Sequence, residues 1–288
     1  MIEEFTTSLP VGFVMFWMGI TGAVVGSFLN VVIHRVPKGE SIAKPASHCP
    51  QCKSKIRFWN NIPLLSFWLL NRRCPDCGAG ISIRYFIVEA LGVIAAILPI
   101  MTYGVSWFAL SGILLGWHLI ALAMIDLETY TIPDHVVLPM LIIGLLMAFV
   151  RGGLGWDLFS ESGFVAGVIE GDSLINAMIA GVVGAGFQVL IFFVSKIIMR
   201  REGIGGGDIT MTTGFSVYLH PALVAFALVF ASFFGIIGSV FRAGMKKTRV
   251  KGHDAIPFGP YLALGAWITF LYGGKIAGAY INWVLSKT

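Results

Sequence analysis

Long apolar runs constrain this chain more than any other feature of its sequence. Seven of them recur along its length, at 11–33, 84–102, 106–125, 135–150, 175–198, 211–241 and 257–285. An α-helix needs about 20 apolar residues to cross a hydrocarbon core of roughly 30 Å. Of the 288 residues, 57% are hydrophobic and only 12% are charged, and the mean hydropathy is +0.84. These values are atypical of soluble globular proteins, so the sequence predicts an all-α polytopic integral membrane protein.

The sixth run is too long for one helix, because as an α-helix it would extend over roughly 46 Å. His220-Pro221 offers a break, since proline disfavours a helical residue before it and cannot complete the backbone ladder. We therefore expect about eight transmembrane helices. An interfacial helix after Gly273-Gly274 is an alternative for the C-terminal part. Residues 1–9 are acidic and the first apolar run is long, so we expect no cleavable signal peptide.

Basic residues gather in three connections between the runs. The first connection is the richest: Arg35, Lys38, Lys44, Lys53, Lys55, Arg57, Arg72, Arg73 and Arg84. The connections 199–207 and 242–255 are also basic, whereas 151–174 is mainly acidic. By the positive-inside rule the three basic connections should be cytoplasmic, which also accounts for their charge without nucleic-acid binding.

All four cysteines lie in the first connection as two pairs. Cys49-Pro50-Gln51-Cys52 and Cys74-Pro75-Asp76-Cys77 are separated by 21 residues. This spacing is typical of a four-sulfur structural zinc site with no open coordination position. Redox chemistry and the replacement of one ligand by His48 are the alternatives. A connection of about 50 residues has little hydrophobic core of its own, so a bound metal ion would stabilise its fold. Its apolar residues should pack on the membrane surface or on the metal module: Phe58, Trp59, Ile62, Leu64, Leu65, Phe67 and Trp68.

Two aspartates stand at the ends of apolar runs. Asp126 follows the stretch 116–125, and Asp208 ends the run 203–208, which is rich in glycine. The expected topology puts both carboxylates at the cytoplasmic face, where they could meet across the helix bundle. Two carboxylates that share a proton can activate a water and protonate a carbonyl oxygen, which indicates an intramembrane aspartic protease. The alternative is that each aspartate only caps a helix.

Five segments, in order along nearly the whole chain, resemble the type IV prepilin leader peptidase family. They are 26–35 in the first run, Cys49 to Glu89 around the cysteine pairs, Ile125-Asp126-Leu127-Glu128 with Ile132-Pro133-Asp134, Gly205-Gly206-Gly207-Asp208, and Ile256-Pro257-Phe258-Gly259-Pro260. The fourth matches the Gly-x-Gly-Asp motif of the family. Thr210 and Phe86 stand where many members have lysine and proline, and neither departure removes a catalytic group.

The resemblance implies a bifunctional enzyme of the bacterial inner membrane. Such enzymes cut the basic leader from prepilins or type II secretion pseudopilins on the cytoplasmic side, then methylate the new amino terminus with S-adenosylmethionine. Asp126 and Asp208 match the protease aspartates. The methyltransferase activity rests on the resemblance alone, and Glu89 and Asn60-Asn61 are candidate contributors without assigned roles.

Other candidates are less specific. Glu128, Asp134 and Glu202 could bind a basic leader, and His118 lies about two helical turns before Asp126. We divide the chain into a first span (1–33), a zinc-binding loop domain associated with methylation (34–83) and a transmembrane protease domain (84–288). An ion-coupled transporter and a noncatalytic zinc-bearing scaffold remain the alternative functions. The sequence does not indicate which prepilin is the substrate or whether the protein is a monomer or a dimer.

Overall fold

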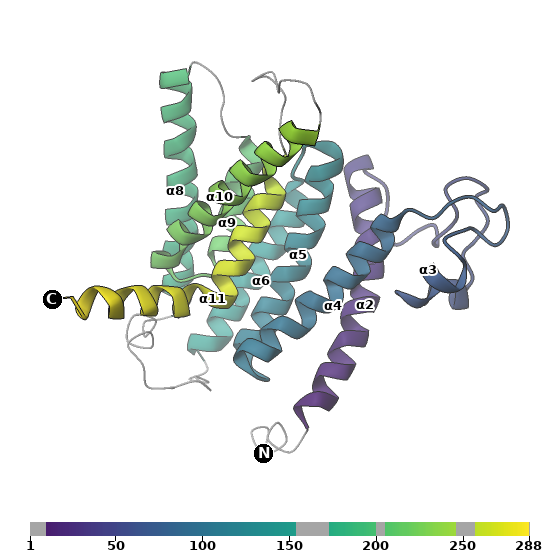
Figure 1. Ribbon diagram of the computed structural model, residues 1–288, viewed down its shortest axis with the longest axis horizontal. Helices are drawn as coiled ribbons and strands as arrows, with labels where there is room; N and C mark the ends of the chain where they lie inside the picture. Colours follow the sequence, from purple (N-terminus) through teal and green to yellow (C-terminus); the bar gives the residue numbers. More distant parts are fainter. Residues whose placement is uncertain (1–9, 154–172, 200–204, 246–256, 288) are drawn as a thin grey trace. The chain divides into compact units, whose positions relative to one another are not determined.

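The computed structural model describes residues 10–153, 173–199, 205–245 and 257–287. Among these residues the regular secondary structure is helical (Figure 1). The longer helices are α2 (Val11–Arg35), α4 (Ile83–Tyr103), α5 (Trp107–Thr129), α6 (Asp134–Gly153), α8 (Ser173–Met199), α9 (Gly206–Ser216), α10 (Pro221–Met245) and α11 (Gly259–Leu285). The connection between α2 and α4 holds three short helices, η1 (Val36–Lys38), η2 (Phe58–Asn61) and α3 (Leu65–Leu69). The all-α prediction is confirmed.

Six of these helices are long and apolar enough to cross a membrane: α2, α4, α5, α8, α10 and α11. The predicted count of eight is not confirmed, because the apolar part of α6, Asp134–Val150, and the 11-residue α9 are shorter than a full span. The predicted break at His220-Pro221 is confirmed, since α9 ends at Ser216 and α10 begins at Pro221. The C-terminal part forms one helix with its preceding residues, and Figure 1 shows its last turns running in a different direction from its first.

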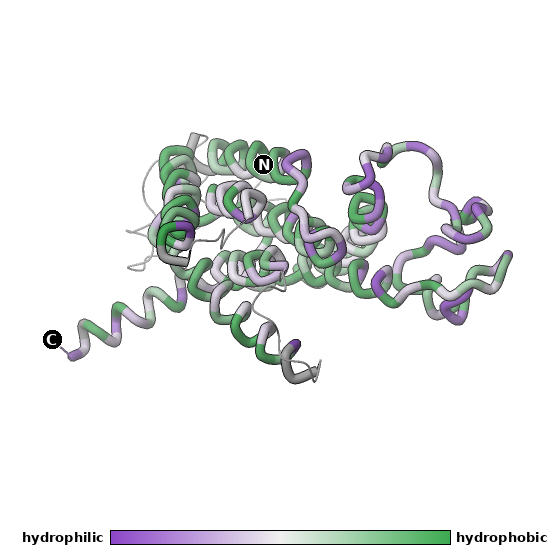
Figure 2. Tube along the Cα trace, turned by 90° about the horizontal axis from the view of Figure 1, so that it is seen from above, coloured by the Kyte–Doolittle hydropathy of each residue, from purple (hydrophilic) through white to green (hydrophobic). Residues whose placement is uncertain are grey.

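The chain divides into two compact units, Met1–Ala121 and Leu122–Thr288. In the first unit α2 packs along α4 through glycines. A Cβ atom at Gly26 would lie 2.7 Å from the Cα atom of Glu89, and one at Gly22 would lie 2.9 Å from the Cα atom of Val93. The two backbones therefore approach more closely than any larger residue allows, as in other membrane helix pairs. The connection 36–82 mixes hydrophilic and hydrophobic residues, unlike the mainly hydrophobic helices (Figure 2).

The second unit is built around the short helix α9, which packs against α6, α8 and α11. Buried polar side chains join it to its neighbours. The Gln188 amide donates to the Thr212 hydroxyl (2.9 Å), and the Tyr218 hydroxyl, just after α9, donates to the Met140 carbonyl (2.9 Å). In an apolar surrounding such hydrogen bonds satisfy groups that would otherwise be costly to bury. They fix the position of α9 and of Asp208 in its first turn.

Candidate active site and metal centre

Asp126 lies in the last turn of α5 and is 5% exposed. Its Oδ2 atom accepts a hydrogen bond of 2.8 Å from the backbone N–H of Gly259, the first residue of α11. A Cβ atom at position 259 would lie 2.8 Å from Oδ2 and 3.0 Å from the Asp126 Cβ atom. Only glycine therefore lets the amino terminus of α11 approach this carboxylate. The first turn of a helix carries unpaired N–H groups and a partial positive charge, which suit a carboxylate.

Asp208 is half-buried at the third position of α9. The Gly205 N–H donates to its Oδ2 atom (3.3 Å), and the Asp208 N–H donates to the Gly205 carbonyl (3.1 Å). The alternative role of this aspartate as a helix cap is thus present in the structure. The pKa of Asp208 is raised from 3.8 to about 6, mainly by burial and to a smaller extent by the nearby Asp126 carboxylate, while the Gly205 N–H opposes the shift.

The glycines that precede Asp208 allow close packing as well as conformational freedom. A Cβ atom at Gly207 would lie 2.8 Å from the Cβ atom of Ile132, in the connection that follows α5. The start of α9 therefore lies directly against the chain that continues from Asp126. The structure brings together Asp126, Asp208 and Gly259, three residues that are distant in sequence. Two carboxylates close enough for one to raise the pKa of the other can act as acid and base on a bound water.

The remaining candidate residues are exposed, make hydrogen bonds within their own helix, or lie outside the described residues. Glu128 and Asp134 are exposed, at the end of α5 and the start of α6. His118 uses Nδ1 to donate to the Leu114 carbonyl one turn earlier in α5 (2.8 Å). Glu202 falls outside the described residues. Thr210 donates its hydroxyl to the Gly207 carbonyl (3.0 Å) within α9.

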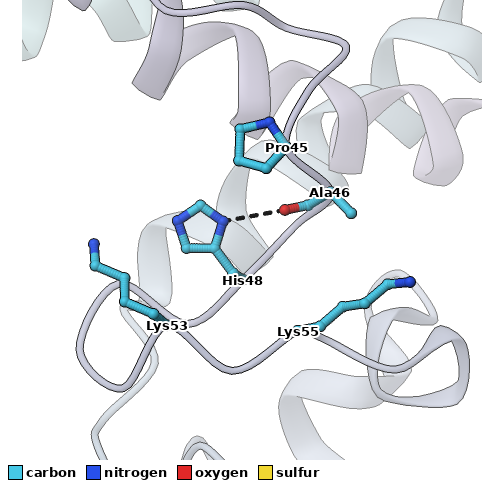
Figure 3. Close-up of a pocket in the computed structure, with 5 residues that line it drawn as sticks. All are labelled: Pro45, Ala46, His48, Lys53 and Lys55. Carbon is cyan, nitrogen blue, oxygen red and sulfur yellow. Dashed lines mark hydrogen bonds between the residues drawn. The ribbon is translucent and has the colours of Figure 1, made fainter.

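The four cysteine sulfurs form one cluster in the first unit. All of them lie within 4.8 Å of one another, with Cys49 to Cys77 at 3.9 Å and Cys52 to Cys74 at 4.0 Å. Tetrahedral coordination with Zn–S bonds of about 2.3 Å would place the sulfurs about 3.8 Å apart, so this set fits such an ion. His48 is not part of the group. Its Nδ1 donates to the Ala46 carbonyl (3.1 Å) in a shallow pocket where Lys53 and Lys55 extend away from each other (Figure 3).

The two cysteine pairs are built on the same backbone pattern. In the first, the Cys49 N–H donates to the Ser54 carbonyl and the Lys53 N–H donates to the Cys49 carbonyl. The second repeats these bonds 25 positions later, from Cys74 to Ala79 and from Gly78 to Cys74. Lys53 and Gly78 both have positive φ, at 60° and 70°, and an antiparallel bridge flanks each turn, His48 to Lys55 and Arg73 to Gly80. The candidate metal centre is therefore a pair of equivalent turns that present two sulfurs each.

Comparison with known proteins agrees with this arrangement. Residues 20–103 match the bacterial peptidase A24 N-terminal domain, and residues 113–240 match the type IV leader peptidase family. A protein of Stutzerimonas stutzeri is 32% identical over 97% of both chains. The chain belongs to the type IV leader peptidase family.

The Stutzerimonas stutzeri protein and other relatives in this family share the name prepilin leader peptidase/N-methyltransferase. The Aeromonas hydrophila protein is 34% identical over 90% of this chain and 91% of its own length. The Pseudomonas aeruginosa protein is 30% identical over 97% of both chains. No solved structure matches the chain. The resemblance drawn from the five sequence segments is confirmed.

The sequence did not predict the hydrogen bond between the Gly259 N–H and Asp126. Segment 256–260 was noted as a signature but had no role, and Ile256 lies outside the described residues. The structure connects this segment to Asp126 through the Gly259 N–H. A backbone donor leaves no side-chain signal, so the only indication in the sequence was a glycine between Phe258 and Pro260 at the start of an apolar run.

Proposed function

We propose that this protein cleaves the leader peptide from type IV prepilins and methylates the amino terminus that the cleavage exposes. The observation that carries the proposal is the correspondence, over nearly the full length of both chains, with relatives named prepilin leader peptidase/N-methyltransferase. Pseudopilins of type II secretion, which have the same need for leader removal, are included as substrates. An ion-coupled transporter or a scaffold would leave this correspondence unexplained.

Proteolysis would use Asp126 and Asp208 as the catalytic pair. Asp126, with the Gly259 N–H holding one of its oxygens, accepts a proton from a water, which then attacks the scissile carbonyl carbon. Asp208, whose pKa is raised to about 6, donates a proton to the carbonyl oxygen. Collapse of the tetrahedral intermediate breaks the C–N bond; the proton taken by Asp126 goes to the leaving amine, and a hydroxyl of the intermediate returns a proton to Asp208 as the carbonyl forms again. Glu128 and Asp134 are candidates for binding the basic leader, since both are exposed, at the end of α5 and the start of α6.

Methylation would take place in the first unit with S-adenosylmethionine as donor. S-adenosylmethionine would supply the methyl group, and the receiving amine must be uncharged and gives up a proton on methylation. Glu89 and Asn60-Asn61 remain candidates for this site. Cys49, Cys52, Cys74 and Cys77 would hold a zinc ion, whose closed set of four sulfurs stabilises the connection without contacting substrate.

We place the protein in the bacterial inner membrane with the aspartates at the cytoplasmic face. The basic connections support this orientation, the first of them above all, because positive residues remain on the cytoplasmic side.

The test is cleavage of a purified prepilin by wild type and by the Asp126→Asn and Asp208→Asn variants, with methylation assayed separately on precleaved substrate. Each variant should lose cleavage by at least about 10⁴-fold, because neither proton transfer has a substitute, and should keep methylation. Retained methylation also serves as the folding control. Full cleavage by either folded variant would remove that residue from the catalytic pair.

A further inference from the structure

The connection between α2 and α4 exposes a group of large apolar side chains outside the six candidate spans. They are Phe58, Trp59, Ile62, Leu65, Trp68 and Leu69. Phe58 is 84% exposed and Leu69 is 73% exposed. We call Phe58–Leu69, which comprises η2, α3 and the link between them, the apolar loop segment. So many exposed apolar side chains within 12 residues indicate an interaction surface, because in water they would promote aggregation.

The apolar loop segment is internally fixed. Ser66 is buried between its two helices, where its hydroxyl donates to the Trp59 carbonyl (3.3 Å) and accepts from the Ile62 N–H (2.8 Å). Phe67 is the aromatic residue that the segment buries, at 5% exposure. The exposed side chains therefore belong to an ordered backbone and are not the outcome of an open, unstructured loop.

The apolar loop segment is attached by its contacts to α4, one of the six candidate membrane-spanning helices. The Phe86 ring packs against Phe67 and Trp68, with centroids 5.4 and 5.6 Å apart, and Glu89 Oε2 accepts the Leu64 N–H at 2.7 Å. Phe86 and Glu89 lie in the first two turns of α4, within about 10 Å of its start. With 21 residues, α4 is about as long as the hydrocarbon core is thick. A helix of this length that crosses the core places its first two turns within about 10 Å of the boundary between headgroups and acyl chains, so the apolar loop segment would be held near that level.

The charged residues that flank the apolar loop segment in sequence, between positions 53 and 73, are all basic. Lys53, Lys55 and Arg57 precede it, Arg72 and Arg73 follow it, and all five side chains are exposed. The Arg72 guanidinium lies over the Trp68 ring, 5.5 Å from its centroid. Aromatic rings with adjacent cations are typical of the interface of a bilayer with anionic lipids.

We propose that the apolar loop segment inserts shallowly into the interface of the bilayer that the helices cross, with Arg57 and Arg73 contacting anionic phospholipid headgroups. The insertion removes the exposed apolar area from water and holds the cysteine cluster at the membrane surface. The Phe86 ring, on which Phe67 and Trp68 pack, anchors the segment to α4 at this level.

The test is photo-cross-linking of the full-length protein in lipid nanodiscs. The probes are phosphatidylglycerol and phosphatidylcholine, each with a diazirine near the carbonyl end of one acyl chain, and adducts are located by peptide mass spectrometry. Adducts on 58–69 should exceed those on 41–46 of the same connection by at least about tenfold. Segment 41–46 is a matched reference because it contains the exposed apolar residue Ile42.

Two sets of variants separate the apolar and the charged contributions. Phe58→Ser, Trp59→Ser and Leu69→Ser together should reduce the adducts on 58–69 to the level of 41–46, whereas Ile42→Ser should leave them unchanged. Arg57→Gln and Arg73→Gln should each reduce the preference for phosphatidylglycerol by about fivefold. Arg72 is left intact because it contacts Trp68.

Absence of enrichment in the wild type would overturn the proposal, as would equal labelling by the two lipids. A photoreactive leader-bearing peptide that labels 58–69 while the lipids do not would identify the segment as a substrate surface, which also overturns it. Metal content and thermal midpoint check that the triple variant folds. If it does not fold, the wild type and the two arginine variants still decide the question.

Discussion

At the scale of single residues, the candidate active site depends on backbone groups as much as on carboxylates. Asp126 is held by the Gly259 N–H, and Asp208 is held by the Gly205 N–H. The two aspartates were predicted from the sequence because a carboxyl group at the end of an apolar run is costly unless it has a function. Their donors could not be predicted in the same way, since every residue except proline has an N–H group.

Gly259→Ala should reduce prepilin cleavage by about tenfold to a hundredfold while methylation of precleaved substrate stays normal. The added Cβ atom would lie 2.8 Å from Asp126 Oδ2, so α11 or the carboxylate must shift, and small displacements at a reacting group have effects of this size. Gly186→Ala is the matched control, because a Cβ atom there meets nothing within 4 Å. Unchanged cleavage by Gly259→Ala would contradict the positioning role of this contact.

The pH dependence of cleavage should reflect the raised pKa of Asp208. A carboxyl group with a pKa of about 6 keeps its proton where an ordinary aspartate, at 3.8, has lost it. The proton donor is therefore present below pH 6 and lost as the pH rises through that value. The alkaline limb of the kcat profile is expected near pH 6, measured in a buffer series at constant ionic strength. A limb at 3.8, or a flat profile through neutral pH, would argue against Asp208 as the proton donor.

At the scale of helices, the sequence predicted where most elements lie but not how closely they pack. Apolar runs and the His220-Pro221 break located the long helices, because spanning length and proline leave direct signals. The short α9 was counted as a full span because its apolar run continues into α10, but its 11 residues are too few to cross a membrane. The α2–α4 contact was likewise hidden among the 35 glycines of the chain, of which only some lie at a helix interface.

Gly26→Val should destabilise the first unit by about 1–3 kcal/mol or more, because its Cβ atom would meet the Glu89 Cα atom at 2.7 Å and force α2 away from α4. The measurement is the thermal midpoint of the purified protein in one detergent. Gly12→Val, where a Cβ atom meets nothing within 4 Å, serves as the control. Equal midpoints for the two variants would show that the contact between the helices is not a tight one.

At the scale of the whole molecule, the chemistry divides between two units. The four cysteines lie in Met1–Ala121, and both aspartates lie in Leu122–Thr288. The division by function at 1–33, 34–83 and 84–288 stays a prediction. It differs from the division into compact units, which falls within α5. Loss of the metal should therefore reduce methylation more than it reduces prepilin cleavage.

Cys49→Ser combined with Cys74→Ser should abolish stoichiometric zinc and reduce methylation by at least about tenfold, with cleavage largely retained. Metal content is measured by mass spectrometry of the purified protein, and the two activities are assayed separately. His48→Ala is the control, because His48 lies outside the four-sulfur cluster and should keep both metal and methylation. Normal methylation by a stable, zinc-free variant would contradict the structural role of the site.

The sequence by itself determined the membrane character, the four-cysteine cluster and the two aspartates. Each of these is a property of composition or of short-range spacing: apolar length must match the bilayer, and two Cys-x-x-Cys turns suit one ion. Tertiary structure decided which glycines lie at helix contacts, which backbone N–H holds Asp126, and that the aromatic side chains of the first connection remain exposed beside the start of α4. These features depend on contacts between residues distant in sequence, whose distances and directions are set only when the helices pack.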